Sequence, residues 1–293
     1  MFEGFSQAEI QTSDPECKIN LRYGGSGPPV LLLHGNPLTL VTWYLIAPPL
    51  ARDFTVVCAD LRGYGDSSKP PTTPDHAPYS KRAMACDQIE VMRQLGFETF
   101  SVVGHDRGAR CAYRMALDHP DRVHKLAVLD IVSTGDALRG ANMSFAMDFW
   151  VWFFLAQPAD LPERIIGANP QAILDYMLDG WSAVPNAFPP DVRAEYARTF
   201  SNPETIHAIC EEYRAAASLD YELDEADKGA RRIVCPVLAL WGGKGALPGW
   251  YDVLAVWRGW ADDVRGRAVD CGHFLPEEAP DETYRALREF LAS

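Results

Sequence analysis

Five short apolar runs, each bounded by Gly, Pro or Asp, most constrain the fold of this chain. They lie at residues 30–33, 54–59, 100–103, 126–129 and 234–240. Runs without polar alternation are typical of strands in a parallel sheet that is covered on both faces. Between the second and third runs, Ser80 can cap a helix and Gly96 can end it. This alternation predicts an α/β protein, with a mostly parallel sheet covered by helices.

The alternation of strand and helix stops between residues 135 and 220. Tryptophan, phenylalanine and tyrosine occur there at helical spacings among proline breaks, and strand-like runs resume only at Val234. We expect an inserted helical cap at residues 135–220, in one core built from residues 1–134 and 221–293. Two tandem domains fit less well, because the last segment is too short for a sheet of its own.

Composition excludes several classes of protein. The chain has 47% hydrophobic and 23% charged residues, as an average soluble globule does, which excludes a disordered chain and a coiled coil. Its net charge of -13 argues against partners such as nucleic acid or an anionic membrane. No run reaches the roughly 18 apolar residues of a membrane span. Seven cysteines without a C-x-x-C pair, and no signal peptide, predict a cytoplasmic protein.

The most informative stretch follows the run at 100–103. Gly104, Asp106 and Gly108 fill the pattern small-x-nucleophile-x-small, in which small residues allow a strained turn from a strand into a helix. The pattern predicts that Asp106 is a nucleophile at the carboxyl edge of the sheet. A carboxylate is already ionised, and it can displace a leaving group from an sp³ carbon. The alternative is that Asp106 only caps the following helix.

Three further motifs surround this turn in the sequence. They are His34-Gly35-Asn36-Pro37, the segment at 60–67, and Gly272-His273. With the turn, they resemble the α/β-hydrolase family over essentially the whole chain. The resemblance implies that His273 is the general base, which deprotonates the water that hydrolyses an Asp106 ester. It also implies that the backbone amides of Asn36 and Arg107 form an oxyanion hole.

The family order of nucleophile, acid and histidine leaves two positions for the acid. One follows the strand-like run at 126–129, and the other follows the run that ends at Leu240. The second position, residues 241–250, contains no Asp or Glu. Asp130 is therefore the predicted acid that orients His273, although it could instead be a carboxylate that only caps the end of a strand.

Two arginines follow the nucleophile, Arg107 directly and Arg110 one helical turn later. Planar guanidinium groups match a carboxylate bidentately. At the sheet edge they predict a small acid as substrate, with its leaving group on the carbon beside the carboxylate. The alternative is that both arginines pair with acidic neighbours.

The motif Asp-Arg-Gly-x-Arg, together with Asp130 in Leu-Asp-Ile, resembles the haloacetate dehalogenases, specifically the fluoroacetate dehalogenase group. The likeness continues at residues 114–120, 154–158 and 213–215. It implies that the two arginines bind the substrate carboxylate, and that a His, a Trp and a Tyr of the cap bind the departing halide. Trp152 and Tyr213 match the last two, but they could instead only pack in the cap.

Val151 stands where this group has the halide-binding histidine. A hydrogen bond to a charged partner contributes about 1.5–3 kcal/mol. Its loss predicts carbon–fluorine cleavage that is slower by roughly tenfold to more than a hundredfold. Valine in the substrate pocket could also make room for a larger halogen or a 2-alkyl group.

These features predict a hydrolytic dehalogenase of small 2-haloacids, which works through an aspartyl ester with water and needs neither a cofactor nor a metal. Two alternatives stay open. One is an epoxide hydrolase with the same nucleophile and with two of Tyr176, Tyr196 and Tyr213 on the epoxide oxygen. The other is a small-acid binding protein without turnover. The family resemblance also suggests a homodimer.

Overall fold

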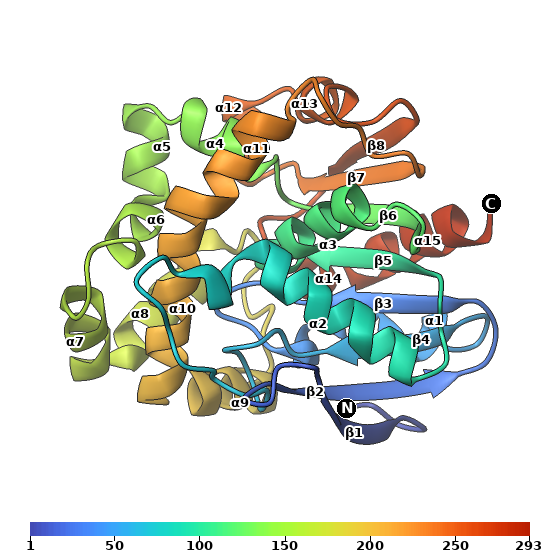
Figure 1. Cartoon of the computed structure of the whole chain (residues 1–293), viewed down its shortest axis with the longest axis horizontal. Helices are drawn as coiled ribbons and strands as arrows, with labels where there is room; N and C mark the ends of the chain where they lie inside the picture. Colours follow the sequence, from blue (N-terminus) through green and yellow to red (C-terminus); the bar gives the residue numbers. More distant parts are fainter.

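A single eight-stranded sheet forms the centre of the computed structural model, which describes all residues 1–293 (Figure 1). The strands, in chain order, are β1 (Ser6–Gln11), β2 (Lys18–Gly25), β3 (Pro29–Leu33), β4 (Thr55–Ala59), β5 (Phe100–His105), β6 (Val123–Leu129), β7 (Val237–Gly242) and β8 (Val264–Val269). Their order across the sheet is β1-β2-β4-β3-β5-β6-β7-β8. β2 runs antiparallel to β1 and β4, and the other neighbouring pairs are parallel. The predicted fold class is confirmed.

Strands β3 to β7 coincide with the five apolar runs. In β3 and β4 every residue after the first is buried, as expected for strands with helices on both faces. β7 begins at Val237 and not at Val234, whose side chain is 74% exposed. β1 and β2 were not predicted. The residues of β1 are all exposed or half-buried, so this edge strand has no apolar run to reveal it.

Helices cover both faces of the sheet. They are η1 (Leu40–Trp43), α1 (Ala47–Leu50), η2 (Ala77–Tyr79), α2 (Lys81–Gln94), α3 (Arg107–Asp118), α12 (Leu247–Trp250), α13 (Val253–Arg258), α14 (Leu275–Glu278) and α15 (Pro280–Ala292). α2 and α3 pack together on one face, and α1 and α15 on the other (Figure 1). Right-handed crossovers produce this arrangement, because the chain moves one way from β3 to β4 and the opposite way from β4 to β5 and β6.

The ends of helices α2 and α14 show how single residues limit a helix. The Ser80 hydroxyl accepts a hydrogen bond from the Ala83 amide at 3.3 Å and caps α2, as predicted, and Gly96 follows the helix with a φ of 90°. The chain closes with two helices, α14 and α15, because Pro280 keeps Ala279 out of the helical conformation.

A layer of helices lies between β6 and β7 in sequence. These helices are α4 (Thr134–Arg139), α5 (Met143–Asp148), α6 (Trp150–Leu155), α7 (Leu161–Ala168), α8 (Pro170–Trp181), α9 (Pro190–Phe200), α10 (Pro203–Ala215), the π-helical turn η3 (Ala216–Asp220) and α11 (Tyr221–Asp227). Most of them lie together beside one end of the sheet (Figure 1). α10, η3 and α11 run on without a strand across residue 220, so the limits 135 and 220 of the cap stay a prediction.

None of the helices combines the length and the apolar character that a membrane-spanning segment needs. All seven cysteines have free thiols, and six of them are buried.

Candidate active site

Asp106 lies on a strained turn between β5 and α3. Its backbone has a φ of 47° and a ψ of -116°, a conformation that costs free energy and recurs at functional sites. A Cβ atom on Gly104 would lie 2.4 Å from Ala109 Cα, and one on Gly108 would lie 2.4 Å from the His34 carbonyl oxygen. The turn therefore requires both glycines. The Asp106 side chain makes no capping bond to α3, which argues against the capping alternative.

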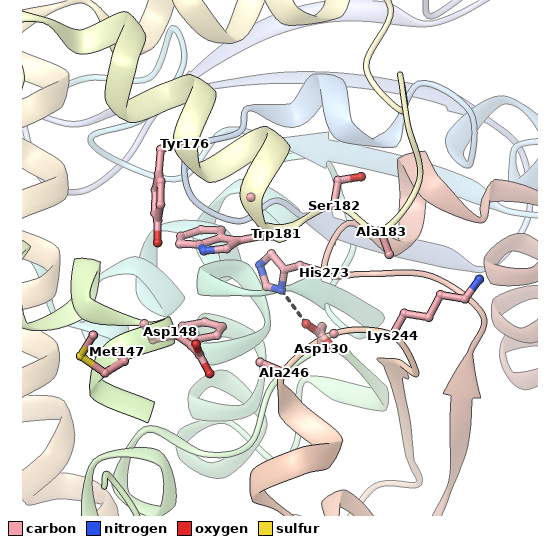
Figure 2. Close-up of a pocket in the computed structure, with 13 residues that line it drawn as sticks. Asp130, Met147, Asp148, Tyr176, Trp181, Ser182, Ala183, Lys244, Ala246 and His273 are labelled. Carbon is pink, nitrogen blue, oxygen red and sulfur yellow. Dashed lines mark hydrogen bonds and ion pairs between the residues drawn. The ribbon is translucent and has the colours of Figure 1, made fainter. Parts of the chain in front are cut away.

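The structure brings His273 and Asp130 to this turn from distant parts of the sequence. His273 Nδ1 lies 2.6 Å from Asp130 Oδ2, a contact that Figure 2 shows as a dashed line. The other oxygen of Asp130 accepts a hydrogen bond from the Gly242 amide at 2.8 Å. On the far side of the ring, His273 Nε2 is 3.9 Å from Asp106 Oδ2. The imidazole thus lies between two carboxylates, with Nε2 directed to Asp106.

The electrostatics of the site favour an ionised Asp106. Burial raises the pKa of this carboxyl, but the charges of His273 and Arg107 outweigh burial and lower it to about 2. Burial lowers the pKa of His273, whereas its bond to Asp130 and the charge of Asp106 raise it above its ordinary value. Asp106 Oδ1 also accepts a hydrogen bond from the Asn36 amide at 3.0 Å. These shifts favour a carboxylate on Asp106 and the protonated form of the His273 ring.

Two hydrogen bonds, one with His105 and one with Trp181, hold the loop that carries His273. His105 Nε2 lies 2.8 Å from the His273 carbonyl oxygen, and burial lowers the pKa of His105 to about 3, so its ring is neutral. The His273 amide donates to the Trp181 carbonyl at 3.0 Å. The Trp181 ring meets the imidazole edge to face, with 5.6 Å between centroids. The sequence did not point to either residue, because His105 fills a variable position of the pattern at 104–108 and Trp181 lies outside the motifs.

Arg107 is fully buried, and it pairs with an acid on one edge only. Its Nε donates to Glu212 Oε1 at 2.8 Å, while Nη1 is buried without a partner. The guanidinium carbon lies 4.1 Å from the centre of the Tyr213 ring. The alternative that the arginines pair with acidic neighbours therefore holds only for the Nε edge of Arg107, because Nη1 keeps no partner.

Arg110 has no acidic hydrogen-bond partner. Its Nη1 donates to the Val132 carbonyl at 3.1 Å and to the Thr134 hydroxyl at 3.2 Å, and its Nε is buried without a partner. Its guanidinium carbon lies 4.4 Å from the centre of the Trp152 ring. Its positive charge is therefore not neutralised by a direct contact, and it lies one helical turn from the nucleophile.

Trp152 and Tyr213 meet edge to face, with 5.9 Å between ring centroids and 82° between planes. Both rings stack on the arginines, so they form part of the site and not only of the helical layer. Asn36 Nδ2 donates to the Tyr213 hydroxyl at 3.5 Å, which links this pair to the amide that holds Asp106. Val151 is 1% exposed and lies directly before Trp152 on α6.

The hydroxyls of the other two tyrosines considered for an epoxide each have a hydrogen-bond partner. The Tyr196 hydroxyl donates to Glu277 Oε1 at 2.9 Å, and the Tyr176 hydroxyl accepts from Trp150 Nε1 at 2.8 Å. Tyr213 stacks on Arg107, and Tyr176 lines a cavity together with Asp130 and His273.

Two cavities flank this centre. A cavity of about 400 Å³ is lined by Asp130 and His273, by aromatic residues of the helical layer such as Trp181, and by the loop of Lys244 (Figure 2). A second cavity of about 240 Å³ has eight hydrophobic lining residues, which include Trp152 and Tyr213. Val151 lines neither cavity. No group of three or more His, Cys, Asp or Glu side chains is arranged to hold a metal ion.

Comparison with known proteins places the chain in a family. A model of the alpha/beta hydrolase fold matches residues 28–280. A fluoroacetate dehalogenase from a Burkholderia species is 47% identical over the whole of this chain and 95% of its own length. A soluble epoxide hydrolase from Corynebacterium sp. (strain C12) is 35% identical, over 92% of this chain and 91% of its own.

A solved structure from Nostoc sp. PCC 7120, classed as an alpha/beta hydrolase, agrees with the fold. It superposes with a TM-score of 0.97 at 56% identity and covers 99% of both chains. With the full-length matches to curated enzymes, these likenesses extend over the sheet, the strained turn and the helical layer alike. The protein is therefore a member of the alpha/beta hydrolase fold family and, within it, of the haloacetate dehalogenase group.

Proposed function

We propose that the protein hydrolyses small 2-haloacids to 2-hydroxy acids. The observation that carries the proposal is a pair of buried guanidinium groups, Arg107 and Arg110, each with an unpartnered nitrogen beside an ionised Asp106. Such a pair matches a substrate carboxylate and holds the neighbouring carbon at the nucleophile. The 47% identity to a fluoroacetate dehalogenase supports the same reaction.

In the first step an oxygen of Asp106 attacks the carbon that bears the halogen. The carbon–oxygen bond forms while the carbon–halogen bond breaks, and the halide leaves with the bonding electrons. The low pKa of Asp106 keeps the nucleophile ionised at neutral pH. Trp152 and Tyr213 stack on the arginines, and they are the proposed hydrogen-bond donors to the leaving halide.

In the second step water attacks the carbonyl carbon of the aspartyl ester and gives a proton to His273 Nε2. The ester oxygen of the product then leaves and takes a proton back. The Asn36 amide already holds Asp106 Oδ1 at 3.0 Å, so it is aimed at one carboxyl oxygen, and the Arg107 amide is the proposed second donor. Asp130 fixes the ring so that Nε2 faces the ester.

The two steps are coupled through charge. The negative charge of Asp106 contributes to the raised pKa of His273 in the resting enzyme. Esterification removes that charge, so the pKa of His273 falls when the ring must accept a proton from water. The ring can then give its proton to solvent, and it is neutral when it accepts a proton from the attacking water.

Halide release tests the proposal. Purified protein is incubated with fluoro-, chloro- and bromoacetate, and halide is measured by ion chromatography. We expect chloride and bromide release to exceed fluoride release, because Val151 offers no hydrogen-bond donor to the strongly hydrated fluoride. Asp106→Asn should release no halide above background. No release from any of the three substrates, with wild type and Asp106→Asn alike, would contradict the proposal.

A histidine variant separates an enzyme from a binding protein. In His273→Ala the ester should form and persist, because no base activates water. Mass spectrometry of the intact protein should then show one added carboxymethyl group after incubation with chloroacetate, and no addition in the double variant Asp106→Asn/His273→Ala. Reversible binding without a mass change in His273→Ala would favour the binding protein.

An epoxide hydrolase is the second candidate, supported by 35% identity to a soluble epoxide hydrolase and by the shared nucleophile. The Tyr196 hydroxyl already donates to Glu277, and the epoxide mechanism gives no role to the unpartnered nitrogens of Arg107 and Arg110, which counts against it. Diol formation from small epoxides that does not depend on Arg110 would favour this activity.

The proposal also includes the limits of the cap, the location of the protein and its oligomeric state. Residues 135–220 act as a cap over the core of residues 1–134 and 221–293. The free thiols suit a reducing, cytoplasmic location, and family resemblance suggests a homodimer, which analytical ultracentrifugation would test.

A further inference from the structure

A cluster of buried polar side chains lies behind Arg107, away from the proposed reaction. It joins three helices through Lys81 of α2, Arg107 of α3 and Glu212 of α10, with Tyr64 from the segment after β4. Lys81 is 1% exposed, and Arg107 and Glu212 are fully buried. A buried lysine is rare and needs a partner, and here that partner is the acid that also binds Arg107.

Glu212 is the centre of this cluster. Its Oε1 accepts hydrogen bonds from Arg107 Nε at 2.8 Å and from Lys81 Nζ, and its Oε2 accepts one from the Tyr64 hydroxyl. Its backbone carbonyl also accepts from Arg107 Nη2 at 3.4 Å. The Nε edge of the guanidinium is therefore fixed, and Nη1 is left without a protein partner.

The charges of Lys81, Arg107 and Glu212 do not cancel. Burial raises the pKa of Glu212, but Arg107 and Lys81 outweigh burial and lower it, so the carboxylate is ionised. Burial and Arg107 lower the pKa of Lys81 below its ordinary value, and Glu212 and Asp220 offset this only in part. The geometry is that of an ion pair, because Nζ lies directly against the ionised carboxylate of Glu212. Glu212 alone would neutralise Arg107, and Lys81 adds back one positive charge. Asp220, which accepts a hydrogen bond from the Lys81 amide at 2.9 Å and whose pKa burial raises to about 6, offsets that charge in part.

We propose that Lys81 and Glu212 are positioning residues for Arg107. Glu212 orients the guanidinium through Nε, and Lys81 offsets the charge of Glu212, so that Arg107 presents a net positive charge to the substrate carboxylate. The inference rests on the proposed function in one respect, namely that the substrate is an acid. It adds two residues, from α2 and α10, that do not touch the substrate.

Charge variants test the inference through the KM for chloroacetate. Lys81→Met makes the group of Lys81, Glu212 and Arg107 neutral, and we expect KM to rise about tenfold, equivalent to about 1.4 kcal/mol, with a kcat within about threefold of wild type. Lys81→Arg keeps the charge and should leave KM near that of wild type. Lys81→Met/Glu212→Gln restores one net positive charge and should recover most of the lost affinity. A purely structural role of Lys81 predicts no such recovery.

Lys69 provides a matched control. Its Nζ donates to the carbonyl oxygens of Gly65 and Ser67, each at 2.7 Å, and not to Glu212. Lys69→Met removes the same charge from a partly buried lysine, and we expect an unchanged KM. An equal rise of KM in both lysine variants would overturn the inference, because it would show a general effect of net charge.

Two further outcomes would overturn it. One is a wild-type KM in folded Lys81→Met. The other is a tenfold higher KM in Lys81→Met/Glu212→Gln, a variant that stays decisive if Lys81→Met does not fold. If wild type releases no halide from any haloacetate, the proposed function fails by itself. The cluster is then judged by acetate affinity in calorimetry, where equal affinities of wild type and the charge variants would refute it.

Discussion

At the scale of single residues, partners rather than burial decide the state of a carboxyl group. Asp106 and Glu277 are both buried, yet burial raises the pKa of Glu277 to about 8 while the pKa of Asp106 falls to about 2. Glu277 accepts hydrogen bonds only from the hydroxyls of Thr42 at 2.6 Å and Tyr196 at 2.9 Å, and these weak donors do not offset desolvation. Asp106 has cationic neighbours, whose charges outweigh desolvation and lower its pKa.

Glu277 should make the folded state less stable at alkaline pH. A carboxyl whose pKa is raised on folding stabilises the native state fully below the unfolded pKa, and this contribution is lost as pH rises through about 8. We expect it to lower the free energy of unfolding by up to about 1.4 kcal/mol per pH unit between these limits. Urea unfolding of wild type and Glu277→Gln at several pH values measures the contribution of Glu277 to the free energy of unfolding. Parallel pH profiles of the two proteins would contradict the assignment.

At the scale of elements, one side chain fastens the His273 loop to the helical layer. The Glu278 carboxylate accepts hydrogen bonds from the amides of Ala183, Val184, Gly272 and Phe274, at 2.7, 3.1, 2.8 and 2.8 Å. A Cβ atom on Gly272 would lie 2.6 Å from the Ala183 nitrogen, so glycine is needed for this approach. The segment after α8 and the loop of the base therefore form one bonded unit at the larger cavity.

Removal of this carboxylate should both destabilise the fold and slow ester hydrolysis. Glu278→Ala leaves the four amides without their acceptor, and we expect a loss of about 1–3 kcal/mol in the free energy of unfolding. It should also increase the fraction of ester-bound protein at steady state, because His273 loses its fixed position. Urea unfolding and mass spectrometry of quenched reactions measure the two effects.

Glu282→Ala is the control for this prediction. Glu282 pairs with Arg267 on the surface, and exposed ion pairs contribute little to stability. A Glu278→Ala protein that is as stable as Glu282→Ala, with no more ester, would show that the four amides find other partners.

At the scale of the whole molecule, the net charge is negative, whereas the groups proposed to bind the substrate carboxylate are positive. The chain carries a charge of -13, whereas Arg107, Arg110 and Lys81 gather buried positive charge at one end of the sheet. Long-range repulsion acts on an approaching anion, and screening shortens its reach from about 30 Å at 0.01 M salt to about 8 Å at 0.15 M. The attraction inside the site is buried and is screened much less.

Moderate salt should therefore leave kcat/KM for chloroacetate unchanged or raise it. The measurement compares low ionic strength with about 0.15 M, in two salts without halide, so that competition by one anion is separated from screening. A fall of kcat/KM by the same factor in both salts would show that the surface around the entrance attracts the substrate despite the net charge.

Local sequence determined the parts of this protein that depend on neighbouring residues. The apolar runs predicted strands β3 to β7, Ser80 predicted the start of α2, and Gly104 and Gly108 predicted the strained turn of Asp106. Each feature follows from sterics or burial within a few residues, so the pattern is visible in the chain itself. The edge strand β1 and its neighbour β2 were not predicted, because polar residues interrupt both strands and neither contains an apolar run.

Tertiary structure alone decided which side chains meet. His273 and Asp130 are separated by 143 positions, and only the parallel order of β6, β7 and β8 brings them within 2.6 Å. The motif indicated that Arg107 is important, but not that Glu212 holds one of its edges or that Lys81 balances the charge. Such contacts join helices that are distant in sequence, and their geometry depends on packing between elements, for which the spacing of residues along one chain carries no signal.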